Sequence, residues 1–247
     1  MVTKLVEMQD IHKWFGKVYS LRGVDFDVNR SEIVGLVGDN GAGKSTLIKI
    51  LTGVFPPTEG RVFIRGKEVK FSSPKEARDN GIETVYQEEA LGEDLSIARN
   101  LFMGKEPQKS IGFIKLLDLE KMKKESERML NELGMRISSM EQQAKFCSGG
   151  EKQGIAIARA MYFKADLIIL DEPTRALGIL GVKQVMNHVK ELKKRGIACI
   201  FITHNLHHVY PIADRFVILS RGKKIGDTLK KNTSIDKLTK LMIRKRA

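Results

Sequence analysis

The segment GDNGAGKST, residues 38–46, has the residue types and spacing needed to hold the phosphates of a nucleotide. It matches G-x-x-x-x-G-K-[ST], in which glycines let backbone amides curl around phosphate oxygens, the lysine neutralises phosphate charge and the hydroxyl ligates Mg²⁺. An apolar stretch, EIVGLVG, precedes it and a helical pattern, KSTLIKILTG, follows it. The sequence therefore predicts a nucleotide site made of Gly38, Asp39, Asn40, Gly41, Ala42, Gly43, Lys44, Ser45 and Thr46.

A second apolar stretch, LIILDEPT at 167–174, ends in two carboxylates. Transfer of a phosphoryl group to water uses one carboxylate that holds Mg²⁺, directly or through water, and a residue that orients the attacking water. An Asp-Glu pair after a strand is more often a turn or helix-start feature, but beside a phosphate loop it favours catalysis. We predict that Asp171 and Ser45 ligate Mg²⁺, that Lys44 stabilises the transferred group and that Glu172 polarises the water.

A third segment, FCSGGEKQGIAIARA at 146–160, also suits an anion. Its Ser-Gly-Gly triplet opens a predicted helix, so bare amides and the positive helix end converge there. The chain thus carries two phosphate-binding elements, far apart in the sequence.

These groups need a framework that brings strand ends together. We predict strands at KLVEMQDIHKWF, VDFDV and EIVGLVG, and strands covered on both faces at DLIIL and IACIFIT. Between the last two, VKQVMNHVKELKKRG predicts a helix ended by Gly196. A strand, helix and strand joined by a right-handed crossover form a parallel sheet. The apolar stripe of that helix is Val182, Val185, Met186, Val189 and Leu192.

The region from Leu95 to about Phe163 has a helical pattern. In LEKMKKESERMLNELG, apolar residues recur at helical spacing and charges occupy the other face. We predict a helical insertion at about 89–163 within a single domain, 1–247. The residues of the stripe are Leu119, Met122, Ser126, Met129, Leu130 and Leu133.

Composition limits the class of protein. With 247 residues and 42 % hydrophobic content the chain can bury a core, and no apolar run reaches the roughly 18 residues of a membrane span. The start of the chain has no apolar core of a secretion signal. Cys147 and Cys199 form no C-x-x-C pair, which fits a reducing cytosol. His204 and His208 have i, i+4 spacing, but without an H-E-x-x-H pattern we expect no zinc there.

The net charge of +13 and the isoelectric point near 9.7 raise nucleic acid or an anionic membrane surface as partners. Much of the excess lies in the last segment, RGKKIGDTLKKNTSIDKLTKLMIRKRA. No aromatic residues interleave with these charges, so a base-stacking surface is not indicated. We expect this segment to be a solvated basic surface and expect no direct binding of nucleic acid.

The chain carries, in this order, GDNGAGKST, the Gln of VYQ, CSGGEKQ, LIILDEPT and the His of FITHN. The order and spacing of these motifs resemble those of the nucleotide-binding subunits of ABC transporters. The resemblance implies ATP and Mg²⁺ as cofactors. It implies that Phe15 stacks on adenine, that Gln87 senses Mg²⁺ and the membrane partner, and that His204 contacts the γ-phosphate. Trp14, beside Phe15, is the alternative adenine platform. The implied fold class is α/β: a P-loop NTPase parallel sheet with helices on both faces, an N-terminal antiparallel β subdomain and an inserted α-helical subdomain.

The same resemblance explains the second phosphate element. In this family two nucleotide-binding domains close head to tail, and the signature of one covers the ATP bound by the other. Ser148, Gly149 and Gly150, with Glu151 beside them, would then serve a neighbour's nucleotide, most simply in a homodimer. Further implied partners are membrane permease subunits and, indirectly, a sugar-binding protein, which places the chain peripherally on the cytoplasmic face of the membrane. We expect LGEDLSIARNLF, residues 91–102, to form the groove that grips the permease.

Four positions depart from the family pattern. Cys147 stands where Leu is usual and Glu151 where Gln is common, and neither removes the Ser-Gly-Gly amides. Gly178 replaces an Asp that crosses the dimer interface, which puts communication between the two sites in doubt, and Arg175 replaces the usual Ala. Gly178 and the segment ARDNGIETVYQE, residues 77–88, resemble the monosaccharide-import branch of the family.

The leading hypothesis is therefore the ATPase subunit of an importer for a sugar, and the resemblance favours a monosaccharide. One alternative is a soluble ABC-type ATPase acting on nucleic acid or ribosomes, motivated by the charge of +13. Another is the ATPase subunit of an exporter, which the same motifs permit.

Overall fold

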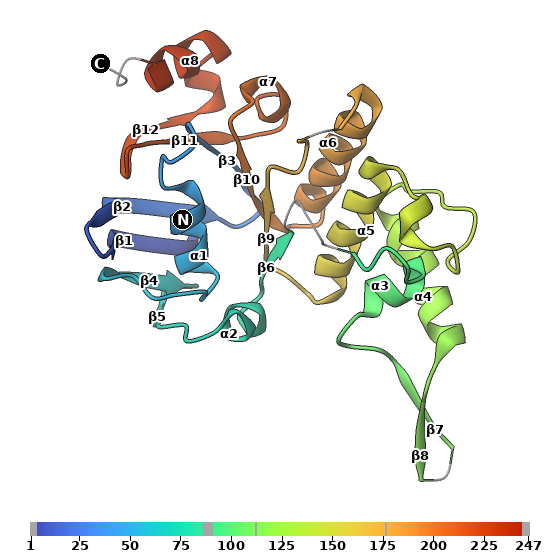
Figure 1. Cartoon of the computed structure of the whole chain (residues 1–247). Helices are drawn as coiled ribbons and strands as arrows, with labels where there is room; N and C mark the ends of the chain where they lie inside the picture. The colour runs from blue at the N-terminus through green and yellow to red at the C-terminus, as the bar shows by residue number, and fades with distance from the viewer. Residues whose placement is uncertain (1–3, 86–90, 112, 176, 244–247) are drawn as a thin grey trace.

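The computed structural model describes residues 4–85, 91–111, 113–175 and 177–243. Its centre is a six-stranded sheet in the order β12-β11-β3-β10-β9-β6 (Figure 1). Neighbours from β11 to β6 pair in parallel, as predicted, and β12 pairs antiparallel with β11 at the edge. The strands are β3 (Ile33–Val37), β6 (Ile82–Val85), β9 (Leu167–Asp171), β10 (Ala198–Thr203), β11 (Arg215–Ser220) and β12 (Lys223–Leu229).

A four-stranded antiparallel sheet, in the order β2-β1-β4-β5, confirms the expected N-terminal β subdomain. Its buried side chains share one hydrophobic core with α1 (Lys44–Leu51) and with one face of the central sheet. Helix α1 ends as the sequence predicts, because Gly53 follows with a φ of 71°. The strands are β1 (Lys4–Phe15), β2 (Val18–Asn29), β4 (Glu59–Ile64) and β5 (Lys67–Val69).

Strand β9 has an apolar residue at each position from 167 to 170 because both of its faces are covered. Leu167 and Ile169 point into the core that contains α1, whereas Ile168 and Leu170 point into a second core on the opposite face. Successive side chains of a strand alternate between faces, so a strand covered on both sides needs apolar residues at every position. Strand β10 alternates in the same way.

Helices cover the second face of the central sheet (Figure 1). In α6 four residues of the predicted stripe, Val185, Met186, Val189 and Leu192, are buried, and the fifth, Val182, is half-buried against the same core. Among the residues that the structure describes, no helix is long and apolar enough to cross a membrane. The helices outside the insertion are α2 (Pro74–Asp79), α6 (Ile179–Lys194), α7 (Leu206–Val209) and α8 (Ile235–Ile243), with a 3₁₀ turn at Lys230–Asn232, and α5 (Gly149–Tyr162) ends the insertion.

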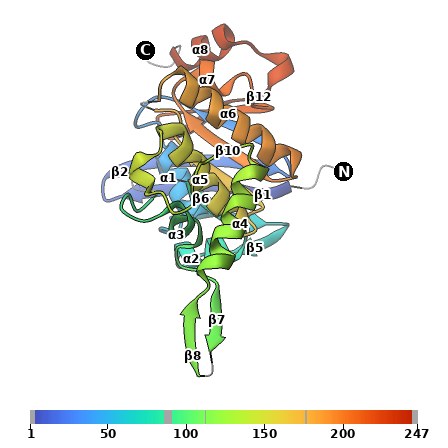
Figure 2. The ribbon, with the colours of Figure 1, turned by 90° about the vertical axis from the view of Figure 1, so that its right-hand side faces the viewer.

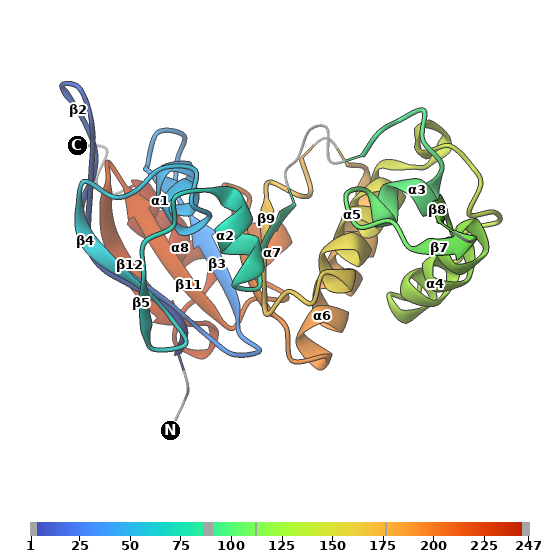
Figure 3. The same ribbon diagram turned by 90° about the horizontal axis from the view of Figure 1, so that it is seen from below.

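The insertion is not uniformly helical, which corrects the sequence-based reading of residues 95–163. It contains α3 (Ile97–Phe102), α4 (Leu119–Glu132) and a 3₁₀ turn, Ala144–Phe146, but also an antiparallel hairpin, β7 (Gln108–Ile111) with β8 (Ile114–Leu117). Figure 3 shows α3 and α4 at the opposite end of the molecule from β2 and β4. The α4 stripe is buried as predicted except for Leu119, which is 53 % exposed because it is the first residue of the helix, next to the hairpin.

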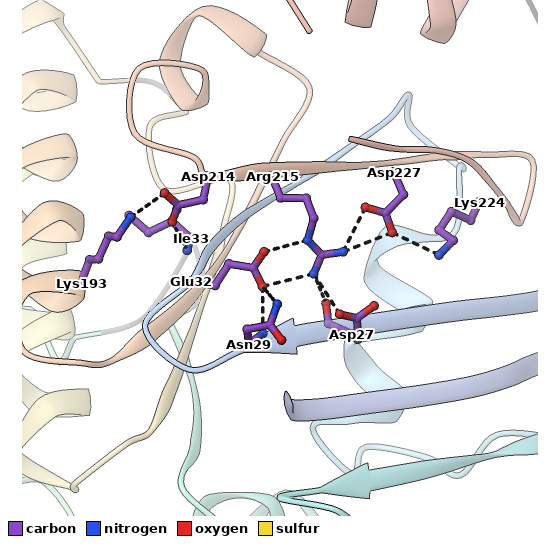
Figure 4. Close-up of polar contacts among 9 residues, drawn as sticks. All are labelled: Asp27, Asn29, Glu32, Ile33, Lys193, Asp214, Arg215, Lys224 and Asp227. Carbon is purple, nitrogen blue, oxygen red and sulfur yellow. Dashed lines mark hydrogen bonds and ion pairs between the residues drawn. The ribbon is translucent and has the colours of Figure 1, made fainter. Parts of the chain in front are cut away.

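A buried arginine joins the two sheets (Figure 4). Arg215 of β11 donates from Nε to Glu32 Oε1 (2.7 Å), from Nη1 to Asp227 Oδ1 (3.0 Å) and from Nη2 to the Asp27 carbonyl (2.7 Å). Burial alone acts to lower the pKa of Arg215, but the hydrogen bonds and charges of these carboxylates outweigh it and raise the pKa. Strand β2 of the antiparallel sheet is thereby fixed to β11 and β12 of the central sheet.

Candidate nucleotide site

The phosphate loop leaves the carboxyl end of β3 and runs into α1. Gly38 and Gly43 have φ values of 153° and 103°, a region that residues with a Cβ rarely adopt. A Cβ at Gly43 would lie 2.8 Å from the Leu21 side chain and 3.1 Å from the Ser20 carbonyl. A Cβ at Gly38 would overlap the Leu219 carbonyl oxygen, so both glycines are required by backbone conformation and by close packing.

Backbone hydrogen bonds hold the loop in a closed curve. The Ala42 amide donates to the Asp39 carbonyl (3.1 Å), and the Gly222 amide donates to the Ala42 carbonyl (3.0 Å). Asn40 and Gly41 form the exposed outer part of this curve. The loop is therefore anchored from the β11–β12 turn and open to solvent at its tip.

Lys44 is buried, with 7 % of its surface exposed. Its ammonium group donates to the Gly38 carbonyl (2.6 Å) and the Asp39 carbonyl (3.0 Å). Burial lowers the pKa of Lys44, and the charges of Glu172 and Asp171 oppose that shift. The structure thus places the predicted lysine and both predicted carboxylates in one electrostatic cluster.

The two hydroxyls after Lys44 differ in surroundings. Ser45 is exposed, as a metal ligand at a binding surface must be, whereas Thr46 is half-buried. The Thr46 hydroxyl pairs with the Ser20 hydroxyl on β2 at 2.8 Å. Thr46 therefore ties the start of α1 to the antiparallel sheet.

Glu172 follows β9 in a left-handed conformation, with a φ of 49°, which costs energy for a residue with a Cβ. Its carboxylate accepts hydrogen bonds from the Thr203 hydroxyl and the His204 amide, both at 3.2 Å. His204 Nδ1 lies 2.7 Å from Glu172 Oε1. The ends of β9 and β10 thus bring the predicted catalytic pair together, across 32 positions of sequence.

Asp171, the last residue of β9, is half-buried. Burial raises the pKa of Asp171, the nearby negative charge of Glu172 raises it further, and the positive charges of Lys44 and Lys49 lower it. A cation bound beside Asp171 would offset the repulsion between its carboxylate and that of Glu172.

Sequence reasoning missed Thr203 and a polar network behind the catalytic pair. His208 Nδ1 lies 2.9 Å from the Thr174 hydroxyl, and Asn205 Nδ2 lies 3.3 Å from His208 Nε2. His208 is thus half-buried in a network, while His207 is exposed. The one sequence signal that pointed to Thr203 is its position, because it ends an apolar strand directly before His204.

The aromatic residues at the end of β1 differ in availability. The Trp14 ring already stacks on the Tyr19 ring, with centroids 4.5 Å apart. The Phe15 ring is 46 % exposed and touches the Phe55 ring only by an edge contact, with Lys13 Nζ 5.4 Å from its centroid. Phe15 therefore has the face that is free to accept a flat ligand.

Ser148 caps the N-terminus of α5, as predicted for the second phosphate element. Its hydroxyl accepts from the Glu151 amide (3.3 Å), and its own amide donates to Glu151 Oε2 (2.7 Å), which makes a capping box. Glu151 is thus committed to the cap in this structure, and its contact with a nucleotide stays a prediction.

The two signature glycines are held by the start of α6. A Cβ at Gly149 would lie 2.5 Å from Leu177 Cδ2, and one at Gly150 would overlap the Gln184 side chain and meet Gly181 Cα at 3.0 Å. Gly178 is the N-cap of α6 and provides no side-chain cap. Gln87 lies outside the described residues, so its predicted roles are untested.

A sequence profile of the ABC transporter family matches residues 21–175, which include the phosphate loop, the signature and both carboxylates. The chain belongs to the ABC transporter family. This match confirms the resemblance on which the predicted fold and ATPase activity were based.

Individual relatives of this ABC cassette are named as ATP-binding proteins of sugar import. It is 43 % identical over 241 residues to a xylose/arabinose import ATP-binding protein, XylG, of Sulfolobus acidocaldarius, with 98 % of this chain and 94 % of that protein covered. It is 42 % identical over 217 residues to a fructose import ATP-binding protein, FrcA, of Rhizobium meliloti, covering 86 % and 84 %. It is 38 % identical to a ribose import ATP-binding protein, RbsA, of Bacillus subtilis. That alignment covers 96 % of this chain but only 48 % of the relative.

The fold is likewise that of a solved ABC cassette. A crystal structure of the ADP conformation of an ATP-binding cassette of an ABC transporter superposes with a TM-score of 0.81 at 25 % identity, covering 98 % of this chain and 96 % of that one. A nucleotide-free cassette from an ABC transporter superposes with a TM-score of 0.82 at 26 % identity, covering 97 % and 99 %. The predicted fold class is confirmed.

Proposed function

We propose that this chain is the ATP-hydrolysing subunit of an ABC importer for a monosaccharide. The observation that supports ATP hydrolysis is that Lys44, Glu172 and His204 lie together at the carboxyl ends of adjacent parallel strands. The sugar class rests on relatives named for xylose, arabinose, fructose and ribose import. No feature of the site itself selects one sugar.

Within one chain, the phosphate loop would hold ATP. Amides of residues 38–46 and the Lys44 ammonium would surround the β- and γ-phosphates, and Phe15 would stack on adenine. The Ser45 hydroxyl and the Asp171 carboxylate fit Mg²⁺, because both are oxygen donors and the neighbouring Glu172 adds a second negative charge. Mg²⁺ bound there would neutralise phosphate charge.

Glu172 would act on the attacking water. Its carboxylate is held from two sides by Thr203 and His204, so its orientation is set before the substrate arrives. His204 is 56 % exposed and lines one pocket with Asp39 of the phosphate loop, where it would contact the γ-phosphate. These residues would orient the water, while Lys44 stabilises charge on the transferred group.

A second nucleotide-binding chain would complete the site, most simply an identical one. The Ser148 and Gly149 surface is exposed and would cover the γ-phosphate of the other chain's ATP. Two apolar side chains at the start of α6, Ile179 and Leu180, are 88 % and 78 % exposed beside this signature. Their position supports burial against the second chain, in place of the missing carboxylate at Gly178.

The permease would bind near Gln87 and the helical insertion, on the cytoplasmic face of the membrane. The predicted groove needs revision, because Ile97, Leu101 and Phe102 of α3 are fully buried in the chain's own core. Leu95 and Met103 are exposed, at 36 % and 39 %. Leu95 of the segment, and Met103 directly after it, are thus apolar side chains that a permease can reach.

The test is a pull-down of the tagged Glu172→Gln chain from its native membranes with ATP present, with Lys44→Ala as the control that should not hold ATP. Recovery of a polytopic permease by Glu172→Gln but less by Lys44→Ala supports the importer, and its companion binding protein can then be screened against pentoses and hexoses. Recovery of ribosomes or nucleic acid without a membrane protein would sink the importer assignment and favour the nucleic-acid alternative.

A further inference from the structure

The β7–β8 hairpin projects from the helical insertion as a two-stranded ribbon, away from the rest of the molecule (Figures 1 and 2). Its register pairs Gln108 with Leu117 at the base and Ile111 with Ile114 at the tip. Each strand has one partner strand, and within the described part of the chain no third strand covers either edge. Such an isolated ribbon is at best marginally stable in water, so its side chains matter for what it contacts.

The hairpin exposes apolar side chains that a soluble surface would normally cover. Phe113 in the turn is fully exposed, Ile114 is 65 % exposed, and Leu116 and Leu117 are 46 % and 40 % exposed. The only charged residues between 108 and 117 are Lys109 and Lys115, so the segment has two positive charges and no negative one. The tip is therefore apolar, with lysines one and two pairs behind it.

The distribution of these side chains over the two faces distinguishes between partners. Successive residues of a strand point to opposite faces, so Leu116 and Leu117 expose apolar surface on both sides of the ribbon. A protein groove that binds one face leaves the other in water. A bilayer interface surrounds both faces, accepts the apolar tip among the acyl chains and places lysines at the headgroups.

We propose that the β7–β8 hairpin inserts its tip into an anionic lipid surface. Lys109 and Lys115 would contact lipid phosphates, while Phe113 and Ile114 would enter the acyl region. The proposal rests on the proposed function only in taking the chain to work at a membrane. A hairpin without a permease should bind weakly, and it would act as an additional anchor for a chain that a permease already holds.

The test adds a second tryptophan at the hairpin, because Trp14 is the one tryptophan of the full-length chain. Phe113→Trp is mixed with vesicles of brominated phosphatidylcholine, with or without brominated phosphatidylglycerol, and tryptophan quenching is followed as lipid is titrated. The wild-type chain reports on Trp14, which stacks on Tyr19 far from the hairpin. We expect quenching of Phe113→Trp by the anionic vesicles, none of the wild type, and at least tenfold more lipid for half-quenching when Lys109→Glu and Lys115→Glu are added.

Because the chain carries a charge of +13, any basic face can adsorb to anionic vesicles. Lys67→Trp, at the exposed β4–β5 hairpin, therefore controls for simple adsorption. Equal quenching of Lys67→Trp and Phe113→Trp would overturn the proposal. Absence of quenching at residue 113 would also overturn it. The same holds if the fluorescence of residue 113 changes with protein concentration, or with added permease, and does not change with lipid. None of these outcomes bears on ATP hydrolysis, since the experiment contains no nucleotide.

Discussion

The phosphate loop and the signature are both suited to phosphate, but their surroundings are opposite. Lys44 is buried and bonded to its own loop, and Glu172 is fixed by neighbouring β10. Ser148, in contrast, caps an exposed helix end. One phosphate-binding element is thus held by contacts within the chain, and the other is presented to solvent.

The apolar residues around the signature make the same distinction. Phe146, Ile179 and Leu180 are 69 %, 88 % and 78 % exposed. Apolar surface of this kind favours burial, so in the proposed dimer the signature half would gain stability from a second chain, whereas the phosphate-loop half is already packed. The following predictions test this difference, from the largest expected effect to the smallest.

Glu172→Gln should lower ATP turnover by about 100-fold or more, because it removes the group that orients and polarises water, while ATP binding is retained. Steady-state phosphate release and binding of a fluorescent ATP analogue check this. Lys44→Ala should lose binding as well, and Glu68→Gln on the exposed strand β5 should change neither. Near-normal turnover by Glu172→Gln would remove that residue from its assigned role.

Arg215→Ala should destabilise the chain by about 3–5 kcal/mol, because it leaves the buried Glu32 carboxylate, and the partly exposed Asp27 and Asp227, without their cation. The exposed Arg128→Ala, which loses only helix-surface ion pairs, should cost about 0.5 kcal/mol. Urea unfolding of the two variants measures both values. Equal losses would show that the junction between the sheets is not a main source of stability.

The double change Ile179→Ser and Leu180→Ser should weaken the ATP-dependent dimer of Glu172→Gln at least about tenfold, since exposed apolar side chains lose their burial at the interface. The stability of the single chain should stay the same. Sedimentation with ATP and thermal unfolding without it separate the two effects. If Glu172→Gln dimerises equally with or without the double change, the second chain covers some other surface.

His188 on α6 links the insertion to the sheet half, with Nδ1 3.2 Å from the Leu133 carbonyl. Burial lowers the pKa of His188, and that hydrogen bond opposes the shift. The unfolded chain then takes up a proton first, at the ordinary His pKa of about 6.5, so stability should fall as the pH drops below that value. His188→Gln should flatten this part of the profile in urea unfolding, and the exposed His207→Gln should leave it unchanged.

Some of the site was predictable because it depends on local sequence. The phosphate loop, the carboxylates after β9 and the Ser148 helix cap each occupy a few consecutive residues with a fixed backbone requirement. Thr203 and Arg215 were not predicted, since their roles come from partners 31 and 183 positions away. The hairpin at 108–117 was missed because its four-residue strands lack a clear alternation and adjoin strongly helical segments.

The sequence by itself determined the elements and the chemistry. Glycine spacing, buried apolar runs and helix caps act within one strand or turn, so they specify the parallel strands, the phosphate loop and an ATPase of the ABC family. Only the tertiary structure decided how those parts are completed. Strand pairing placed Thr203 and His204 on Glu172, packing of α6 against the signature glycines left Ile179 and Leu180 exposed, and the hairpin extended into solvent. These outcomes depend on which distant surfaces meet, and no local pattern contains that information.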